Sequence, residues 1–218
     1  MCGRFSLTEL KQVLEEMFSM QIDFEFMNNP DFRPTDSILV FHEMAQLMRW
    51  QLIPHWAREI PRNVSSFNAK SEEAHEKPFF RDAFRRAQRC LIPATTFFEW
   101  KHEGKEKIKY SFETTDSPVL AIAGLWDKAT IKGETIYSCT ILTTEANDVV
   151  RPIHVKNRMP VLIHPRDFKT WLNRDLSSAD AFKLAVPYPA EKMNARLVQS
   201  PLSSVKSPTK PRAQLDLF

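Results

Sequence analysis

The chain opens with Met1-Cys2-Gly3-Arg4-Phe5, which places a cysteine next to the first methionine. Because the side chain of Cys2 is small, we expect methionine aminopeptidase to remove Met1 and leave Cys2 at the N-terminus. Cys2 would then carry a thiol and a free amine on adjacent carbons, and such a 1,2-aminothiol condenses with an aldehyde to a thiazolidine ring. The thiol alone can also act as an acyl-transfer nucleophile. The amine titrates at about 8 and the thiol at about 8.5, so a nearby carboxylate or His can move their protons.

Three further side chains have types that suit such chemistry. Asn68 begins Asn68-Ala69-Lys70-Ser71-Glu72, where it either hydrogen-bonds a substrate or belongs to an ordinary helix-entry turn. Glu99 stands among aromatic residues in Phe97-Phe98-Glu99-Trp100, and burial there would raise its pKa toward the range of a general acid or base. The alternative is an edge-strand Glu that reaches water. His154 lies in a loop between apolar runs and is either a proton carrier or a structural residue.

Basic and aromatic residues indicate where a nucleic acid would lie. Trp50 and Trp56 either stack on nucleobases or belong to the core. A predicted helix over residues 78–89 carries four arginines, including Arg85, on a face that either contacts phosphates or is simply solvated. Lys70 can pair with a phosphate or lie in a turn.

Mostly short strands are predicted to position these residues. Ser6-Leu7-Thr8-Glu9 is typical of a capping box, which predicts a helix with Ser6 as its N-cap and apolar residues at helical spacing as far as Phe18. Alternating and apolar runs predict strands over residues 37–41, 46–53, 90–93, 97–101, 107–114, 119–126, 135–144 and 161–163. A short helical turn is predicted over 145–150, and helices are predicted over 165–172 and 179–184. The sum is an α+β fold with a largely antiparallel, barrel-like β core and peripheral helices.

Composition limits the functions open to the chain. Its 218 residues, 43% of them hydrophobic, suit one domain over residues 2–199 and a tail over 200–218. Four glycines are too few for a Gly-rich phosphate loop, and three cysteines without a CxxC pair indicate a reducing cytoplasm. Without an HExxH motif or a Cys/His cluster, no metal or other cofactor is expected. No apolar run reaches the roughly 18 residues of a membrane span, and a net charge of +3 confines any nucleic-acid surface to local clusters.

Five motifs occur in an order that resembles the SRAP family, the SOS response-associated peptidases or abasic-site processing proteins. They are Met1-Cys2-Gly3-Arg4-Phe5, Trp50 to Trp56, Asn68 to Glu72, Phe98-Glu99-Trp100, and Ile153-His154 followed by Arg158-Met159-Pro160. The resemblance runs from Cys2 to about residue 200. It implies a protein of the DNA-damage response that senses abasic sites in single-stranded DNA and crosslinks to the opened sugar through a thiazolidine.

The resemblance also implies roles for single residues. Cys2 would be the nucleophile, Asn68 would place Cys2 and the sugar, Glu99 would shuttle protons, and His154 would polarise or deprotonate the sugar hydroxyl. Arg4, Lys70 and Arg158 would hold phosphates. With the aromatic and basic residues above, the predicted DNA contacts are Arg4, Trp50, Trp56, Lys70, Arg85 and Arg158. The peptidase name rests on self-removal of the leading residue, and β-elimination would be a lyase-type side reaction.

The chain departs from the family pattern at several places. Asp31-Phe32-Arg33-Pro34 stands where Tyr-Asn-x-Ala-Pro is usual, and Gln51 replaces a usual Gly. The segment from His154 to Arg158 is two residues longer than the usual His-x-Arg, so Lys156 can share the phosphate role. Lys70 replaces a frequent Arg, which keeps the charge and loses bidentate geometry.

Two other functions stay open for the sequence. One is a cysteine peptidase or amidase that uses Cys2 with Glu99 and His154. The other is a non-catalytic adaptor that binds single-stranded DNA. For the leading function we expect a monomer in the cytoplasm that is associated with the nucleoid when bound to DNA.

The last residues, Gln214-Leu215-Asp216-Leu217-Phe218, closely resemble the bacterial sliding-clamp-binding motif Gln-Leu-Ser/Asp-Leu-Phe. The preceding Pro/Ser/Lys-rich segment is too polar to join the core and is predicted to be a flexible tether. The apolar side chains of Leu215, Leu217 and Phe218 would fill a preformed pocket on the clamp. The alternatives are docking on the chain's own domain or a chance apolar ending.

Overall fold

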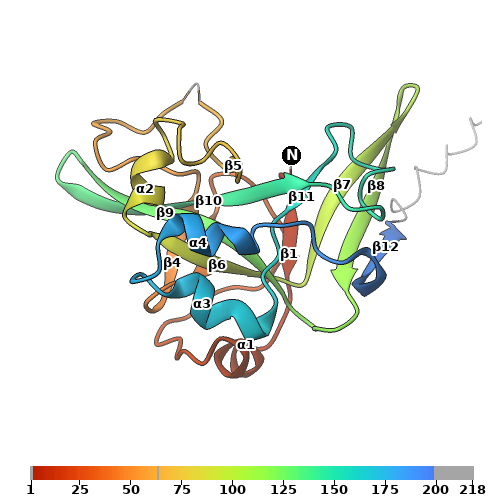
Figure 1. The fold of residues 1–218 in the computed structure, drawn as a ribbon, viewed down its shortest axis with the longest axis horizontal. Coiled ribbons are helices and arrows are strands. Elements are labelled where there is room, and N and C mark those ends of the chain that lie inside the picture. The colour runs from red at the N-terminus through yellow and green to blue at the C-terminus, as the bar shows by residue number, and fades with distance from the viewer. Residues whose placement is uncertain (1, 63, 199–218) are drawn as a thin grey trace, which may run out of the picture.

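A computed structural model describes residues 2–62 and 64–198, in which strands predominate and form two sheets (Figure 1). The first sheet has five strands in the order β12-β8-β7-β1-β2, and all its pairs are antiparallel. Its strands are β1 (Phe5–Leu7), β2 (Asn29–Phe32), β7 (Thr96–Glu103), β8 (Glu106–Thr114) and β12 (Met193–Leu197).

The second sheet has seven strands, and the pairings of five of them close on themselves. β10 pairs with β4, β4 with β3, β3 with β6, β6 with β9, and β9 again with β10. Only the pairs of β10 with β4 and β5 are parallel within the described sheet. The strands are β3 (Ser37–Phe41), β4 (Ala45–Trp50), β5 (Asn68–Lys70), β6 (Arg89–Ala94), β9 (Leu120–Ile131), β10 (Glu134–Glu145) and β11 (Arg158–Pro160). The predicted α+β class with a largely antiparallel β core is confirmed.

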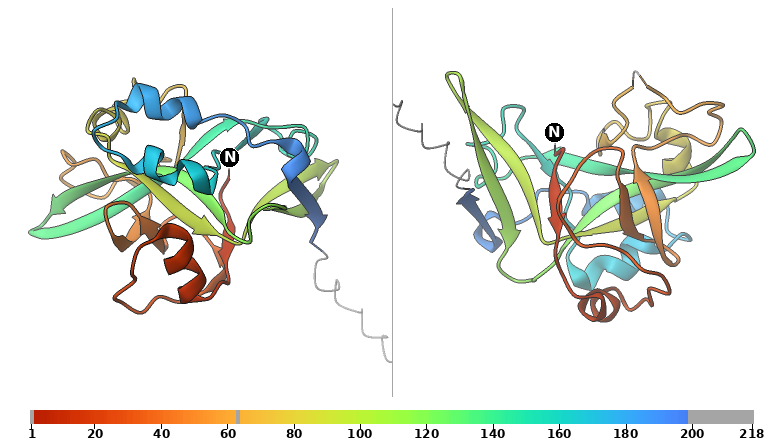
Figure 2. Two further views of the ribbon diagram at one scale, coloured as in Figure 1. Left: turned by 60° about the horizontal axis from the view of Figure 1, so that its bottom comes forward. Right: turned by 180° about the vertical axis from the view of Figure 1, so that it is seen from behind.

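Short helices lie at the periphery of the sheets (Figures 1 and 2). They are α1 (Lys11–Phe18), α2 (Arg81–Arg85), α3 (Phe168–Leu172), α4 (Ser178–Ala181) and the 3₁₀ turns η1 (Pro165–Asp167), η2 (Phe182–Leu184) and η3 (Ala190–Lys192). Stacked aromatic rings join α1 and α3 to the closed ring of strands. Phe41 of β3 and Phe168 of α3 have ring centroids 4.1 and 5.0 Å from that of Phe18 of α1.

One of the connections between the two sheets is a single residue, Thr95, because β6 ends at Ala94 and β7 begins at Thr96. The Thr95 amide donates to the carbonyl of Ser6 at 2.7 Å, which extends the pairing of β7 with β1. The start of β1 therefore lies between the two sheets, close to β11 and β7 (Figures 1 and 2).

The predicted capping box at Ser6 is wrong. Ser6 lies in β1, where its hydroxyl is 2.8 Å from that of Thr96, and α1 begins at Lys11 after Leu10, which makes no side-chain cap. Pairing with two neighbouring strands outweighs the local helix signal, because each paired residue satisfies its backbone groups and buries its side chain. The anchoring expected of a helix comes from strand pairing instead.

The predicted helix over residues 78–89 is also too long. α2 ends at Arg85, and Ala87 adopts a left-handed backbone with φ of 51° before β6 begins. Arg89 is buried rather than part of a basic face, and its guanidinium donates to the carbonyl oxygen of Trp171 at 2.6 Å and to Ser178 at 2.8 Å. It therefore satisfies acceptors around the end of α3 that have no helical partner.

Other predictions differ in detail. The helical turn predicted over 145–150 is a turn that follows the end of β10 at Glu145, in which the amide of Arg151 donates to the carbonyl of Asn147 at 2.8 Å. β11 precedes residues 161–163, of which Leu162 forms an isolated bridge with Ile122. The described part of the chain contains no helix long and apolar enough to cross a membrane, and no group of three His, Cys, Asp or Glu side chains placed to hold a metal. The predicted tail over 200–218, with its clamp-binding motif, lies outside the described residues.

Candidate functional site

Strand pairing places Cys2 in the interior of the molecule. Cys2 comes just before β1, in which Phe5 is paired with Phe32 of β2 on one side and with Phe97 of β7 on the other. Only 1% of Cys2 is exposed, and its thiol lies 3.7 Å from the carbonyl oxygen of Arg4. A residue so close to the start of a chain is usually mobile, so this pairing is what fixes it.

Asn68 holds the backbone of Cys2. It begins β5, which is paired in parallel with β10 so that Asn68 lies beside Ile141. The amide nitrogen of Asn68 donates to the carbonyl oxygen of Cys2 at 2.7 Å. The other end of the same amide, Oδ1, is buried and has no partner among residues 2–62 and 64–198. It is thus an acceptor available for an incoming N–H or O–H.

Glu99 brings a buried carboxyl group to the same place. It lies on β7 between Phe98 and Trp100 and is only 5% exposed. Burial disfavours the charged form and raises the pKa of Glu99 to about 7. Its Oε1 is buried without a hydrogen-bond partner in the described part of the chain. The predicted general acid–base character of Glu99 therefore has a physical cause here.

His154 is held as a neutral ring with a defined tautomer. The backbone amides of Lys156 and Arg158 both point at its Nδ1, at 3.1 and 3.2 Å. Because an amide N–H needs an acceptor, Nδ1 is unprotonated and Nε2 carries the hydrogen. Nε2 lies 3.4 Å from Oε2 of Glu99. Burial is the main cause that lowers the pKa of His154 to about 4, so the ring stays neutral at pH 7.

The carboxyl group of Glu99 affects the pKa of the Cys2 thiol. Burial, followed by the negative charge of Glu99, raises the pKa of the Cys2 thiol well above its usual range. A thiol in this position keeps its proton until a base removes it. Cys2, Asn68, Glu99 and His154, predicted from separate parts of the sequence, thus meet at one place.

An open pocket of about 500 Å³ leads from this cluster to solvent. Glu99 and His154 line its inner part. The rest of its wall comes from the β7–β8 hairpin and the 154–156 loop, namely Trp100, His102, Lys107, Val155 and Lys156. The pocket gives a substrate a route to the buried carboxyl group.

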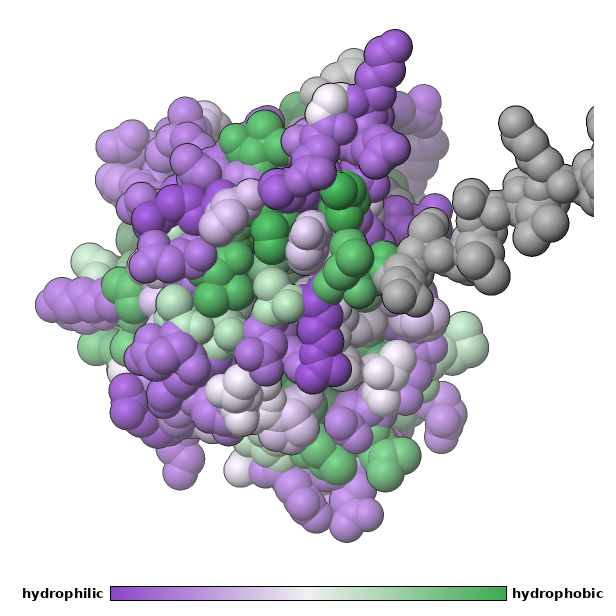
Figure 3. Space-filling view, turned by 90° about the vertical axis from the view of Figure 1, so that its right-hand side faces the viewer, coloured by the Kyte–Doolittle hydropathy of each residue, from purple (hydrophilic) through white to green (hydrophobic). Residues whose placement is uncertain are grey.

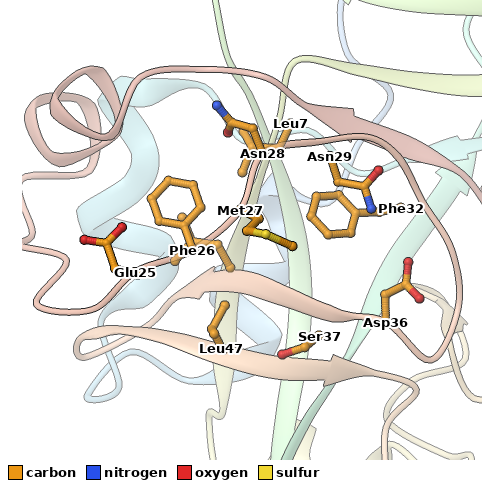
Figure 4. A pocket seen from close by; sticks show the side chains of 11 residues that line it. Leu7, Glu25, Phe26, Met27, Asn28, Asn29, Phe32, Asp36, Ser37 and Leu47 are labelled. Carbon is orange, nitrogen blue, oxygen red and sulfur yellow. The ribbon is translucent and has the colours of Figure 1, made fainter.

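A second cavity, of about 460 Å³, lies between the 25–29 segment and strands β3 and β4 (Figure 4). Phe26, Phe32 and Leu47 make its walls largely apolar. It includes Leu7, at the far end of β1 from Cys2, so it is separate from the cluster around Glu99.

The model of the family described as SOS response associated peptidase (SRAP) matches residues 1–205 of the chain. The chain belongs to the SRAP family. It is 35% identical over 218 residues to the abasic site processing protein YoaM of Bacillus subtilis (strain 168), with 95% of each chain covered. It is equally similar to the abasic site processing protein YoqW of Bacillus phage SPbeta, covering 95% of this chain and 96% of that one. A solved protein structure from Bacteroides thetaiotaomicron superimposes with a TM-score of 0.83 and 28% identity, covering 91% of this chain and 92% of that one.

Three predicted phosphate ligands of this SRAP protein already have carboxylate partners. Arg4 forms a two-pronged pair with Asp31, one prong of which measures 2.5 Å. Arg158 forms another with Glu72, at 2.7 and 2.8 Å. The third, Lys70, lies 2.6 Å from Glu73. Their phosphate roles remain predictions, and each would require the carboxylate to share or yield its cation.

The tryptophans differ from the expectation. Trp50 is fully buried, and its ring N–H donates to the carbonyl of Phe67 at 2.8 Å. It offers no ring face to a nucleobase, so the prediction that it stacks on DNA is corrected and its core alternative holds. Trp56 is 49% exposed and contacts Phe79 edge to face, while Arg85 is exposed on α2. Both of these residues stay candidates by exposure alone.

The acidic partners and part of the pocket wall were not predicted from the sequence. Asp31 and Glu72 are named in the motifs, yet nothing in their spacing indicates which arginines they meet. His102 and Lys107 were not predicted as pocket residues either. Their alternation with Trp100 along two adjacent strands could have indicated that they share its face.

A pH titration of stability tests the burial of Glu99. Its folded pKa is raised from 4.5 to about 7, so the folded protein keeps a proton that the unfolded chain loses. This contribution to stability is present below about pH 4.5 and is lost as pH rises through 7. Relative to Glu99→Gln, the wild-type free energy of unfolding should fall by at most about 3 kcal/mol between pH 4.5 and 8.

Denaturant unfolding at several pH values measures this difference, and His154, present in both proteins, largely cancels. The matched control is Glu106→Gln, which removes an exposed Glu from the neighbouring strand and is measured in the same way. Parallel pH curves for wild type and Glu99→Gln would show that Glu99 titrates like an exposed residue.

Proposed function

We propose that this protein processes abasic sites in single-stranded DNA by forming a covalent bond through Cys2, as part of the DNA-damage response. The observation that carries the proposal is the meeting of a buried cysteine at position 2 with the raised-pKa carboxyl group of Glu99. The family assignment supports it, because the similar Bacillus and phage proteins are named abasic site processing proteins.

In the proposed reaction, Met1 is first removed and Cys2 presents its amine and thiol. The amine attacks the C1 aldehyde of the opened deoxyribose, and loss of the carbonyl oxygen as water gives an imine. The sulfur then attacks C1, forming the C–S bond, while the thiol proton passes to the imine nitrogen. The product is a thiazolidine that links protein and DNA, water is the only molecule released, and no oxidant or reductant is needed.

Glu99 and His154 have complementary parts in this scheme. With a pKa of about 7, Glu99 can give a proton to the departing hydroxyl and take one from the thiol without a large energetic cost in either direction. The Nε2–H of His154 can donate only, because Nδ1 is occupied by two amides. We therefore assign His154 the polarising role, directed at Glu99 or a sugar oxygen, rather than that of a base.

Asn68 serves as the positioning residue. Its Nδ2 fixes the carbonyl of Cys2, which limits rotation of the residue that carries both reacting groups. The Oδ1 of the same amide can accept a hydrogen bond from the α-amine or a sugar hydroxyl. Holding reacting atoms in this way lowers the entropy lost on reaching the transition state.

The peptidase alternative has weaker support. A cysteine peptidase depends on a thiolate, which a neighbouring imidazolium or other positive charge stabilises. Here burial and the charge of Glu99 both raise the pKa of Cys2, and His154 is neutral. Slow, assisted removal of the thiol proton suits condensation with an aldehyde better than attack on a stable amide.

Cys2→Ala should abolish the adduct, because it removes the sulfur that closes the ring. Cys2→Ser should also fail, since an oxazolidine is much less stable than a thiazolidine. The measurement is a denaturing gel of the protein with a single-stranded oligonucleotide carrying one abasic site. Cys139→Ala, another buried cysteine, is the control and should retain the adduct. A heat-resistant adduct formed by Cys2→Ala would contradict the proposal, and intact mass of the wild type reports Met1 removal.

Glu99→Gln should slow adduct formation by roughly 10²–10⁴-fold, the usual contribution of a positioned proton carrier. The amide is nearly isosteric, so reversible binding of DNA should change little. Rates are taken from the time course at saturating DNA, and affinity from fluorescence anisotropy with undamaged single strands. Equal losses in rate and affinity would assign Glu99 a structural role only.

We also propose that Gln214-Leu215-Asp216-Leu217-Phe218 binds the bacterial sliding clamp, a proposal that rests on the sequence motif. Tethering would raise the local concentration of the catalytic domain at replicating DNA. A peptide spanning residues 205–218 should bind the clamp, and a peptide with Leu217 and Phe218 changed to Ala should bind at least tenfold more weakly, because the apolar anchors are gone. Equal affinities of the two peptides would end this proposal.

A further inference from the structure

One face of the β7–β8 hairpin combines aromatic and basic side chains. Side chains alternate between faces along a strand, and the register pairs Trp100 with Lys109 and His102 with Lys107. The residues on this face, which we name the hairpin face, are Phe98, Trp100, His102, Lys107, Lys109 and Ser111. None of the six is acidic. A nucleic-acid strand is attracted by this combination, since cations meet its phosphates and rings meet its bases.

The hairpin face is built around Trp100. The ammonium group of Lys109 lies 3.7 Å from the ring centre of Phe98 and 5.7 Å from that of Trp100. The guanidinium of Arg4 lies 5.9 Å from the centre of the Trp100 ring. These cations orient the indole, and Trp100 remains half-buried, with part of its surface lining the pocket that leads to Glu99.

The hairpin face is continuous with the candidate site. Trp100, His102 and Lys107 form one wall of the pocket whose inner part is Glu99 and His154. The same pocket is also lined by Val155, 68% exposed, and Lys156. Its lining thus combines an indole and an apolar side chain with basic side chains from the β7–β8 hairpin and the 154–156 loop. The space suits a base between two apolar surfaces with its phosphates at the rim.

The cations of this pocket differ from the arginines nearer Cys2. Arg4 and Arg158 are engaged by carboxylates. Within residues 2–62 and 64–198, neither Lys107 nor Lys156 forms an ion pair with an acidic side chain. Phosphates can therefore be bound there without displacing a carboxylate. Seen from the side that carries β7, β8 and β12, apolar residues gather at the middle of the surface and hydrophilic ones surround them (Figure 3).

We propose that the hairpin face and the 154–156 loop bind the nucleotide that adjoins the abasic residue in the same single strand. Trp100 and Val155 hold its base, and Lys107 and Lys156 bind its phosphates. This inference rests on the proposed function for the identity of the damaged residue. It places the path of the strand over β7 and β8, at the opposite end of the molecule from α2 and Arg85 (Figure 1).

The first test measures binding and adduct formation by Lys107→Gln and Lys156→Gln. Each should raise the DNA concentration that gives half-maximal adduct rate several-fold, leave the rate at saturating DNA unchanged, and reduce the salt slope of log K by about 0.7. Lys169→Gln, an exposed lysine on α3, is the matched control and should behave as wild type. Weakening by Arg85→Gln with no effect of Lys107→Gln or Lys156→Gln would overturn the inference.

The second test removes the base instead of the side chain. Trp100→Ala should weaken binding by between about 5-fold and 150-fold, as loss of one stacked base does, and Trp100→Phe should recover most of the affinity. An oligonucleotide lacking the base next to the abasic site on one side should bind wild type more weakly by a similar factor. Trp100→Ala should bind the oligonucleotide that lacks this base as tightly as it binds the complete oligonucleotide. Full additivity of the two losses would contradict stacking on Trp100.

Reversible binding of undamaged single strands, measured by anisotropy with the same variants, separates this inference from the proposed function. If wild type forms no adduct but Lys107→Gln, Lys156→Gln and Trp100→Ala weaken reversible binding, the proposed function fails and the DNA path stands. If wild type forms the adduct and these variants bind as wild type does, the path over the hairpin face is wrong.

Discussion

The antiparallel pairing of β1 with β7 and β2 is the constraint on which the candidate site depends. It takes the second residue of the chain, normally among the most mobile, and fixes it in the interior with 1% exposure. Because Glu99 belongs to the same β7 that holds β1, the proposed nucleophile, Cys2, and its proposed proton carrier, Glu99, are positioned by one set of backbone hydrogen bonds. Asn68 of β5 also holds Cys2 in place, through its hydrogen bond to the carbonyl oxygen of Cys2. Weakening the pairing of β1 would separate Cys2 from both partners together, whereas a change in a peripheral helix would leave the three in place.

Near neutral pH the side chain that titrates in the Glu99–His154 pair is Glu99, and the loop after β10 contributes to this by keeping His154 neutral. Two backbone amides donate to Nδ1, and in the imidazolium form this nitrogen would carry a hydrogen that points at both of them. The charged form of His154 is therefore disfavoured by these amides as well as by burial. The titrating proton is therefore placed on the carboxyl group, whose pKa of about 7 leaves both of its forms populated. The segment between His154 and Arg158 produces this arrangement, because the amides of Lys156 and Arg158 make the contacts that define the tautomer.

Local pattern was enough to predict most strands, whereas the four residues of the cluster were singled out by the family resemblance. Local pattern failed where tertiary contacts compete with local preference. Alternation along 97–101 correctly separated Glu99 from Phe98, and the apolar run at 90–93 correctly indicated a buried strand. The capping signal at Ser6 failed because two neighbouring strands were available to pair with it. The prediction of a basic helix failed at Arg89. Its guanidinium is buried among carbonyl groups from residues more than 80 positions away, and no local pattern indicates such contacts. Trp50 was ambiguous for the same reason, since ring burial depends on the closure of the β3–β4–β10 pairing rather than on its neighbours in sequence.

The charges around the site divide into two classes that suit different tasks. Arg4 and Arg158 are bound by Asp31 and Glu72 in two-pronged pairs, which hold the rigid guanidinium groups in place at little net electrostatic gain. Lys107 and Lys156 line the pocket on flexible side chains and have no acidic partners in the described chain. No paired carboxylate therefore offsets their long-range attraction for a polyanion. A strand approaching the pocket would meet these lysines first and the organised arginines last. At Glu99 burial is the largest influence and raises the pKa to about 7, so the buried carboxyl group can still donate a proton near neutral pH.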